Sequence, residues 1–244
     1  MSDAPEHLVK SYDQELKRLG NLITQMGGLV ESQVALAAEA IMQRDTEAAM
    51  RVVETDPQVD AIEHEVEQFV IRMLALRQPV AADLRNIVAA LKITGDLERM
   101  GDYAANVAKR SIVLSQFQLP LSLSGLWHMA QLVQTNLKLI MDAVSEKDAE
   151  KAVQVWRSDQ VIDDLYNTVF RELITYMMED PRNITPCTHL LFIAKNLERI
   201  GDHATNIAET VHYAVTGEPL TEARPKGDTS SYAVVRPPEQ RVGE

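Results

Sequence analysis

The sequence predicts an all-α protein made of two tandem, internally duplicated three-helix bundles of long antiparallel helices. Three observations predict this class. The chain contains 45% hydrophobic residues but only 5% aromatic residues, a composition that favours helices over sheets. Its apolar residues recur at the three- and four-residue spacings of a helix and do not alternate as in a strand. The same pattern also occurs twice along the chain, which indicates two copies of one structural unit.

The repeat is clearest in two pairs of segments. DLERMGDYAANVAK (Asp96 to Lys109) matches NLERIGDHATNIAE (Asn196 to Glu209), at a period of about one hundred residues. Upstream, the segment from Ala40 to Asp56 matches the segment from Ala143 to Asp159 at a slightly larger offset. Because the matches keep the same order, we expect each half of the chain to form the same three helices.

Local signals predict where each helix begins and ends. In the first half we expect helices near residues 6–43, 46–77 and 82–117, and in the second near 122–146, 149–179 and 186–216. Asp45 and Asp148 are good N-caps, and each is followed by a glutamate in the first turn. Gln78-Pro79 and Asp180-Pro181 should end the middle helices, because proline disfavours helical geometry in the residue before it.

Two further signals involve proline. Thr185-Pro186 resembles a cap followed by proline at the first helical position, so we expect the last helix to begin there. Pro57 falls inside a predicted helix whose counterpart in the second half has no proline, which favours one long helix kinked at Pro57.

These elements define the expected domains. We predict a first bundle over residues 6–117 and a second over 122–216. The remainder, 218–244, is rich in Pro, Ser and charge without helical period, which is typical of a disordered tail.

Composition and charge narrow the possible functions. The formal net charge of −12 argues against a nucleic-acid binder and favours cations or basic partner surfaces. The polar N-terminus does not resemble a signal peptide, and no apolar run is long enough to cross a bilayer, so we expect a cytoplasmic protein without membrane insertion. The single cysteine, Cys187, excludes an internal disulfide and a Cys-rich zinc cluster.

Paired carboxylates are the main candidate for chemistry. Acids four residues apart project from one helix face, and facing pairs on neighbouring helices could form an oxygen-rich site for iron, manganese, magnesium or, less typically, zinc. Close carboxylates also resist ionising together unless a cation or proton compensates them. Four such pairs occur at matching places in the two halves, and they supply our candidate metal ligands: Asp56, Asp60, Glu98, Asp102, Asp159, Asp163, Glu198 and Asp202.

The residues next to these acid pairs help to decide whether the pairs form metal sites. A single acid pair of this kind is most often part of a solvated helix face, but duplication of the whole motif favours a paired site. Gly101 and Gly201 each cost the helix about 1 kcal/mol relative to alanine, which suggests close approach of a helix or ligand. Arg99 and Arg199 are expected to pair with acids or a partner, and Asn106 and Asn206 could add neutral oxygen ligands.

The two halves are not identical at these positions. The first half adds Glu63 and Glu67 to the face that carries Asp60, whereas the second has Tyr166 and Phe170 at the corresponding places. The two sites could therefore differ in metal count or affinity.

Enzymatic alternatives have weaker support. A ferritin-like di-iron enzyme requires two Glu-x-x-His motifs, and the chain offers only Glu209 with His212. Motifs for nucleotide binding or nucleophilic catalysis are absent from the sequence. We therefore expect a protein that is not an enzyme, with no catalytic residues.

Several motifs together resemble the PhoU family, the accessory proteins of bacterial phosphate-specific transport systems. They are LERMGD and LERIGD, with MGGLVESQV (Met26 to Val34), RQPVAADLR (Arg77 to Arg85) and YMMEDPR (Tyr176 to Arg182). The resemblance implies multinuclear metal clusters on the eight carboxylates named above. It also implies a negative regulator of the phosphate-starvation response that links the phosphate ABC transporter's ATPase subunit to a phosphate-sensing histidine kinase, and that is often a homodimer.

Three hypotheses follow. The leading one is a metal-binding adaptor whose loaded bundles hold partner proteins when phosphate is plentiful. A second is a carboxylate-bridged metal oxidase or phosphatase. A third is a metal store or buffer without a role in signalling.

Overall fold

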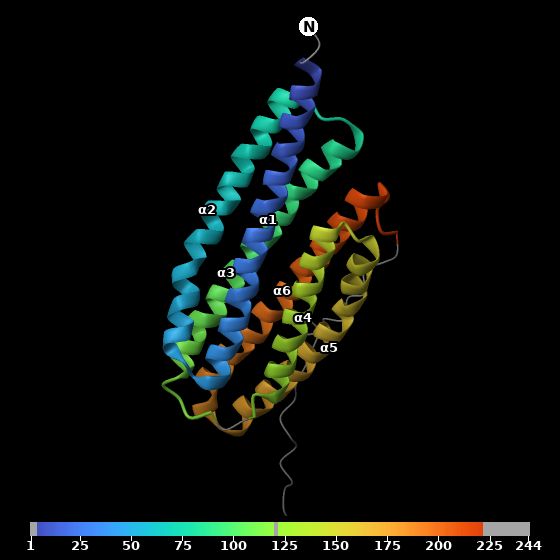
Figure 1. Cartoon of the computed structure of the whole chain (residues 1–244). Coiled ribbons are helices and arrows are strands. Elements are labelled where there is room, and N and C mark those ends of the chain that lie inside the picture. Colours follow the sequence, from blue (N-terminus) through green and yellow to red (C-terminus); the bar gives the residue numbers. More distant parts are fainter. Residues whose placement is uncertain (1–3, 120–121, 222–244) are drawn as a thin grey trace, which may run out of the picture.

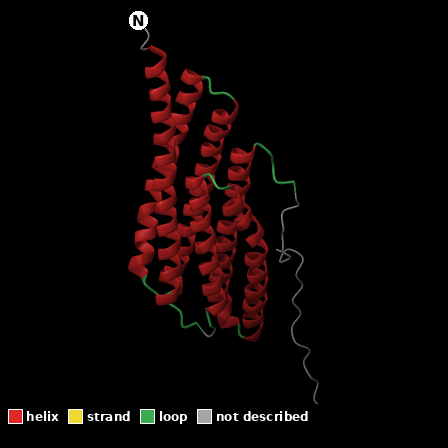
Figure 2. Ribbon diagram, turned by 45° about the vertical axis from the view of Figure 1, so that its right-hand side comes forward, coloured by secondary structure: helices red, strands yellow, loops and turns green. Residues whose placement is uncertain are grey.

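The computed structural model describes residues 4–119 and 122–221, with side chains from residue 12 onward, and these residues are organised as long helices without strands. Figures 1 and 2 show them as two sets of three helices lying side by side along one long axis. The predicted fold class is confirmed. In chain order the elements are α1 (Ala4–Gln43), α2 (Thr46–Arg77), α3 (Ala81–Leu114), α4 (Ser124–Glu146), α5 (Ala149–Glu179), the 3₁₀ helix η1 (Pro181–Asn183) and α6 (Ile184–Thr216).

The N-caps of the middle helices confirm the predicted duplication at atomic detail. Asp45 Oδ1 accepts hydrogen bonds from the backbone N–H groups of Glu47 (2.9 Å) and Ala48 (3.0 Å) at the start of α2. Asp148 Oδ1 accepts the equivalent pair at the start of α5, again at 2.9 and 3.0 Å. Each cap satisfies backbone donors that have no partner within the helix.

Two predicted helix ends were wrong. Helix α3 ends at Leu114 rather than at residue 117, because the Arg44 guanidinium donates to the carbonyl groups of Leu114 (3.2 Å), Ser115 (2.8 Å) and Phe117. These contacts satisfy the last carbonyls and let the chain leave the helix early. Helix α4 begins at Ser124 rather than at residue 122.

The start of α6 also differs from the prediction. The Asp180 carboxylate accepts from the Arg182 backbone N–H (2.9 Å) and caps η1, so the chain is already helical at Ile184 and Thr185 is not a cap. Pro186 is tolerated in this first turn because its missing N–H would have no acceptor there. Helix α2 is continuous through Pro57, which confirms the predicted single long helix, while the kink at Pro57 stays a prediction.

The C-terminal end of α6 has a regular stop. Gly217 adopts a left-handed conformation (φ 79°) and its N–H donates to the Tyr213 carbonyl at 2.9 Å. Residues 218–221 are not helical, and the rest of the predicted disordered tail, 222–244, lies outside the described residues. In the described part of the chain, none of the helices is long and apolar enough to cross a membrane.

The core is continuous across the two halves. Helices α3 and α6 lie at the centre and pack closely against each other, whereas α1 and α2 cover one side and α4 and α5 the other. Small and aliphatic side chains fill the contacts between helices, including the fully buried Met100, Ala104, Ile200 and Ala204 of the repeated motif. Cys187 is buried in the same core, as expected of a small helix residue.

The duplicated glycines allow close helix approach. A Cβ atom on Gly101 would lie 3.0 Å from Gln33 Oε1 of α1, 3.5 Å from Val59 Cγ1 and 3.7 Å from Asp56 Oδ1, the last two on α2. A Cβ atom on Gly201 would lie 3.0 Å from Ile162 Cδ1 of α5. The close approach that the sequence predicted for both glycines is therefore confirmed.

We predict that Gly101→Ala lowers the free energy of unfolding by about 1 kcal/mol, because overpacking exceeds the gain in helix propensity. Gly28→Ala is the control: Gly28 is also inside a helix, but a Cβ there meets no atom within 4 Å. This variant should gain about 0.5–1 kcal/mol. Urea unfolding measures both. Equal stabilisation by the two alanines would show that Gly101 is not needed for packing.

Candidate functional site

The four first-half carboxylates lie together between α2 and α3. Asp56 and Asp60 come from α2, and Glu98 and Asp102 from α3. Burial raises the pKa of Asp56, and the neighbouring charges of Asp102 and Asp60 raise it further. Burial and the charge of Asp102 likewise raise the pKa of Glu98. The fold thus brings all four predicted residues close enough for their charges to oppose one another.

Glu63 also belongs to this cluster. Burial raises the pKa of its carboxyl group, and the charges of Glu67 and Asp60 add to the effect. The sequence had placed Glu63 and Glu67 on the same face as Asp60. The first half therefore contains more acidic side chains than the four of the repeated motif.

A buried amide on α1 completes the first cluster. Gln33 is 1% exposed; its Nε2 donates to the Val52 carbonyl at 3.5 Å, while its Oε1 is buried and accepts no hydrogen bond. That oxygen lies 3.0 Å from the position of a Cβ atom on Gly101, and the Gln33 side chain also hydrogen-bonds the Asp56 carboxyl group, which lowers the pKa of Asp56 against the effects that raise it. A buried acceptor without a donor is costly, so an amide oxygen placed next to carboxylates indicates a site suited to a cation.

Sequence reasoning did not select Gln33 as a site residue. It lies in the MGGLVESQV segment, and its counterpart in the second half, Asn136, is also buried. A buried amide at the same place in both copies is the signal that could have found it.

Arg99 provides partial compensation to the first cluster. Its Nε lies 3.3 Å from Glu98 Oε2 and its Nη1 lies 3.5 Å from Asp102 Oδ2, which confirms the predicted pairing with acids. The arginine side chain is 58% exposed, so water screens both interactions. Arg199 differs: its guanidinium lies over the Tyr103 ring, 5.5 Å from the centroid.

The second-half carboxylates are more deeply buried. Asp159 is 2% exposed, Asp163 3% and Glu198 4%, while Asp202 is only partly buried. Lys195 Nζ lies 2.8 Å from Glu198 Oε1, and the Thr205 hydroxyl donates to Asp159 Oδ1 at 3.1 Å. The protein's own ammonium and hydroxyl groups thus each contact one carboxylate oxygen in this half.

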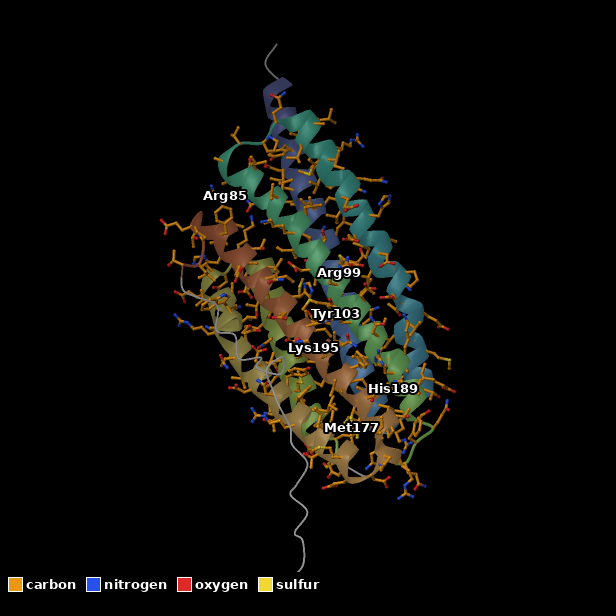
Figure 3. All side chains as sticks on the ribbon, turned by 180° about the vertical axis from the view of Figure 1, so that it is seen from behind. Arg85, Arg99, Tyr103, Met177, His189 and Lys195 are labelled. Atoms are coloured by element: carbon orange, nitrogen blue, oxygen red, sulfur yellow. The ribbon has the colours of Figure 1, made fainter. Side chains whose placement is uncertain are left out.

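Lys195 also contacts an aromatic ring. Its Nζ lies 4.9 Å from the centroid of Tyr166, a residue that replaces Glu63 of the first half. Figure 3 places Arg99 and Tyr103 on α3 and Lys195 on α6, all near the middle of the molecule's length. The two clusters therefore occupy equivalent places but differ in how their charge is compensated.

Asn206 and His203 join the two halves. His203 Nδ1 lies 2.7 Å from Asp96 Oδ1, and Asn206 Nδ2 donates to the same oxygen at 3.3 Å. The His203 and Tyr103 rings also pack at 5.6 Å between centroids. These contacts stabilise the packing of α6 on α3.

The Glu-x-x-His pair does not converge. Trp156 Nε1 donates to Glu209 Oε1 at 3.1 Å, whereas His212 Nδ1 lies 3.0 Å from the Glu218 carbonyl oxygen. The two side chains have different partners, as expected if this motif is not a di-iron ligand pair.

The donor chemistry of the first half fits a hard or borderline cation. Within the described residues, no three His, Cys, Asp or Glu side chains already surround a single point as a ligand set. The first cluster nevertheless combines carboxylates from α2 and α3 with an amide oxygen from α1, and these are the ligands that such cations prefer. In the second half, by contrast, a lysine contacts the buried glutamate.

Comparisons with known proteins match nearly the whole chain. The family model described as "PhoU domain" matches residues 23–111 and 126–211. A "phosphate-specific transport system accessory protein PhoU homolog" of Caulobacter vibrioides is 52% identical over 227 residues, covering 93% of this chain and 99% of that protein. The protein of the same name from Rhizobium meliloti is 47% identical and covers 92% of this chain and 95% of its own length.

Solved structures agree with this likeness. The crystal structure of PhoU from Pseudomonas aeruginosa is similar with a TM-score of 0.83 at 41% identity, over 85% of this chain and 100% of that chain. A phosphate transport system regulatory protein, PhoU from Streptococcus pneumoniae, is similar with a TM-score of 0.79 at 31% identity, over 86% of this chain and 100% of that chain.

The raised carboxyl pKa values predict how pH affects the stability of the metal-free protein. Asp56 and Glu98 have raised pKa values in the folded protein. At pH values above the ordinary glutamate pKa of about 4.3, the unfolded chain has released protons that these two groups still hold in the folded protein. The contribution of these two groups to stability should therefore be full below the ordinary carboxyl pKa and be lost as pH rises through the raised pKa values. Urea unfolding in chelator at several pH values from about 4 upward measures this slope.

We predict that Glu98→Gln raises the free energy of unfolding of the metal-free protein at neutral pH by up to about 1 kcal/mol, because it removes one of several repelling charges. The gain should disappear at acidic pH, where Glu98 is protonated. Glu54→Gln, at an exposed position on the same helix as Asp56, should have little effect at either pH. A Glu98→Gln protein no more stable than wild type at neutral pH would contradict the charge repulsion.

Proposed function

Because this chain belongs to the PhoU family, and is thus an accessory protein of phosphate transport, we propose that it is a negative regulator of the phosphate-starvation response. In this role it couples the phosphate ABC transporter's ATPase subunit to a phosphate-sensing histidine kinase and modulates phosphate uptake. The observation that carries the proposal is the match over nearly the full length of relatives that are named as accessory proteins of phosphate-specific transport.

The proposed adaptor binds a metal ion, whether iron, manganese, magnesium or zinc, at the first carboxylate cluster. Asp56, Asp60, Glu98 and Asp102 would supply carboxylate oxygens, and Gln33 a neutral oxygen. The bound ion would neutralise the cluster. Its support is the burial and the neighbouring charges that raise the pKa values of Asp56 and Glu98, and the buried Gln33 oxygen without a hydrogen-bond donor.

Ion binding in this cluster would act on the arrangement of helices. The ligands come from α1, α2 and α3, so an ion there would link these three helices directly. Helix α3 in turn packs along α6 of the second half. Loading would therefore stiffen the first bundle and fix the surface that partner proteins meet.

Gene deletion tests the regulatory role. We predict that cells without this protein express phosphate-starvation genes in high phosphate, and that the wild-type gene restores repression. A complementing Glu98→Ala/Asp102→Ala gene should restore repression only in part, whereas Glu54→Ala should restore it fully. Starvation-gene expression that does not change on deletion would refute the proposal.

Elemental analysis tests the metal site separately. We predict that untagged protein purified without chelator contains bound metal, and that Glu98→Ala protein purified in the same way contains less metal, because a carboxylate ligand is lost. Glu54→Ala is again the control. Equal metal content in Glu98→Ala and wild-type protein would remove Glu98 from the site, whatever the result in cells.

A further inference from the structure

We infer that Lys195 closes the second carboxylate cluster, with its ammonium in place of a metal ion, so that one chain binds metal only at the first cluster. This inference rests on the metal site proposed above. It assigns the two halves of a duplicated protein to different states: one cluster is compensated by its own lysine, and the other by an ion from solution.

The geometry around Lys195 carries the inference. Its Nζ lies 2.8 Å from Oε1 of Glu198, whose side chain is only 5% exposed, and 4.9 Å from the centroid of Tyr166. A short ammonium–carboxylate contact with a buried partner is stronger than an exposed ion pair. A metal ion that took this place would have to displace the lysine and leave the ammonium next to a second positive charge.

The neighbours of Lys195 are also less suited to a metal than their first-half counterparts. Tyr166 and Phe170 replace Glu63 and Glu67, which removes two carboxylates. Thr205, which replaces Ala105, occupies Asp159 Oδ1 with a hydroxyl donor at 3.1 Å. The second half thus has fewer oxygen ligands and more internal donors.

The first half has the opposite pattern. Gly95 stands at the position of Lys195, and a Cβ atom on Gly95 would lie 3.8 Å from Glu63 Oε1. The position that carries an ammonium in one half therefore faces an additional carboxylate in the other. Arg99, the cation that contacts Glu98, is mostly exposed, and Gln33 Oε1 is buried without a donor. This combination leaves the first cluster dependent on an outside cation.

Substitutions at Lys195 and at its first-half counterpart Gly95 test the inference on the full-length protein. Mn²⁺ is titrated calorimetrically into metal-free protein, and bound Mn²⁺ is counted by elemental analysis. The variant Asp56→Ala/Glu98→Ala keeps Lys195. It should bind no Mn²⁺, since its first cluster has lost two ligands and Lys195 still closes the second cluster. Residual tight Mn²⁺ in that variant would overturn the inference.

Lys195→Met should open the second cluster. This substitution keeps an unbranched apolar side chain but removes the ammonium, so we expect a binding event for Mn²⁺ that wild type lacks, and a thermal midpoint that Mn²⁺ raises even when Asp56 and Glu98 are alanine. Lys195→Arg keeps the charge and should gain no site. The same is expected of Lys195→Met/Glu198→Gln, which removes both charges.

Gly95→Lys should close the first cluster. A lysine three residues before Glu98 repeats the spacing of Lys195 and Glu198, and we expect at least a tenfold loss of Mn²⁺ affinity. Gly95→Ala, whose Cβ makes only ordinary contact, should bind Mn²⁺ as wild type does. Because Gly95 is only partly buried, this arm remains informative if Lys195→Met fails to fold.

The outcomes separate this inference from the proposed metal site. If wild type binds Mn²⁺ and neither Lys195→Met nor Gly95→Lys alters the binding, closure by Lys195 is wrong and the first metal site stands. If wild type binds none but Lys195→Met gains a site, the first-half site is wrong and the closure by Lys195 stands. If neither protein binds Mn²⁺, both are refuted.

Discussion

Repulsion between carboxylates that are partly buried between neighbouring helices is the constraint on which the rest of this structure depends. Each half of the chain places acids from two neighbouring helices against each other, and burial makes every unshared negative charge more costly than it would be in water. A bundle that keeps such a carboxylate cluster must place positive charge next to it. The two halves meet this requirement differently, with Lys195 beside Glu198 in one and a mostly exposed Arg99 beside Glu98 in the other.

The packing of the bundles holds the clusters in place. Gly101 and Gly201 let a neighbouring helix approach closely, so that Gln33 reaches the surface of α3 in the first half and Ile162 packs on α6 in the second. Asp96 receives contacts from His203 and Asn206, which tie α3 to α6. A change in the charge of the first cluster therefore acts on a helix that is itself part of the contact between halves.

Much of this architecture could be predicted from the sequence because its signals are local and occur twice. Asp45 and Asp148 cap their helices through the same two backbone donors, and the helical period is clear in every long element. The errors had two sources. Arg44 ends α3 by reaching carbonyls far along the chain, and such a contact has no pattern within a short window of sequence. The Asp180 side chain starts η1 through a local contact with the Arg182 backbone N–H, a signal that competes with Thr185 as the cap and that the sequence analysis did not select.

The candidate site was predictable only in part for the same reason. Spacing identified the eight acids, but burial and partners decide what each cluster can do. Gln33 was missed because nothing local marks a glutamine as buried beside Asp56, and the role of Lys195 depends on its distance to Glu198. The difference between Gly95 and Lys195 is visible in the aligned repeats, yet it acquires meaning only when the helices are placed together.

Anomalous X-ray diffraction from crystals soaked in Mn²⁺ tests the central claim most directly. The account predicts anomalous density in the first carboxylate cluster, beside Asp102 of α3 and Asp56 of α2, with the Lys195 ammonium still in contact with Glu198 in the other half. Density of equal strength beside Glu198, with Lys195 displaced from it, would contradict the account.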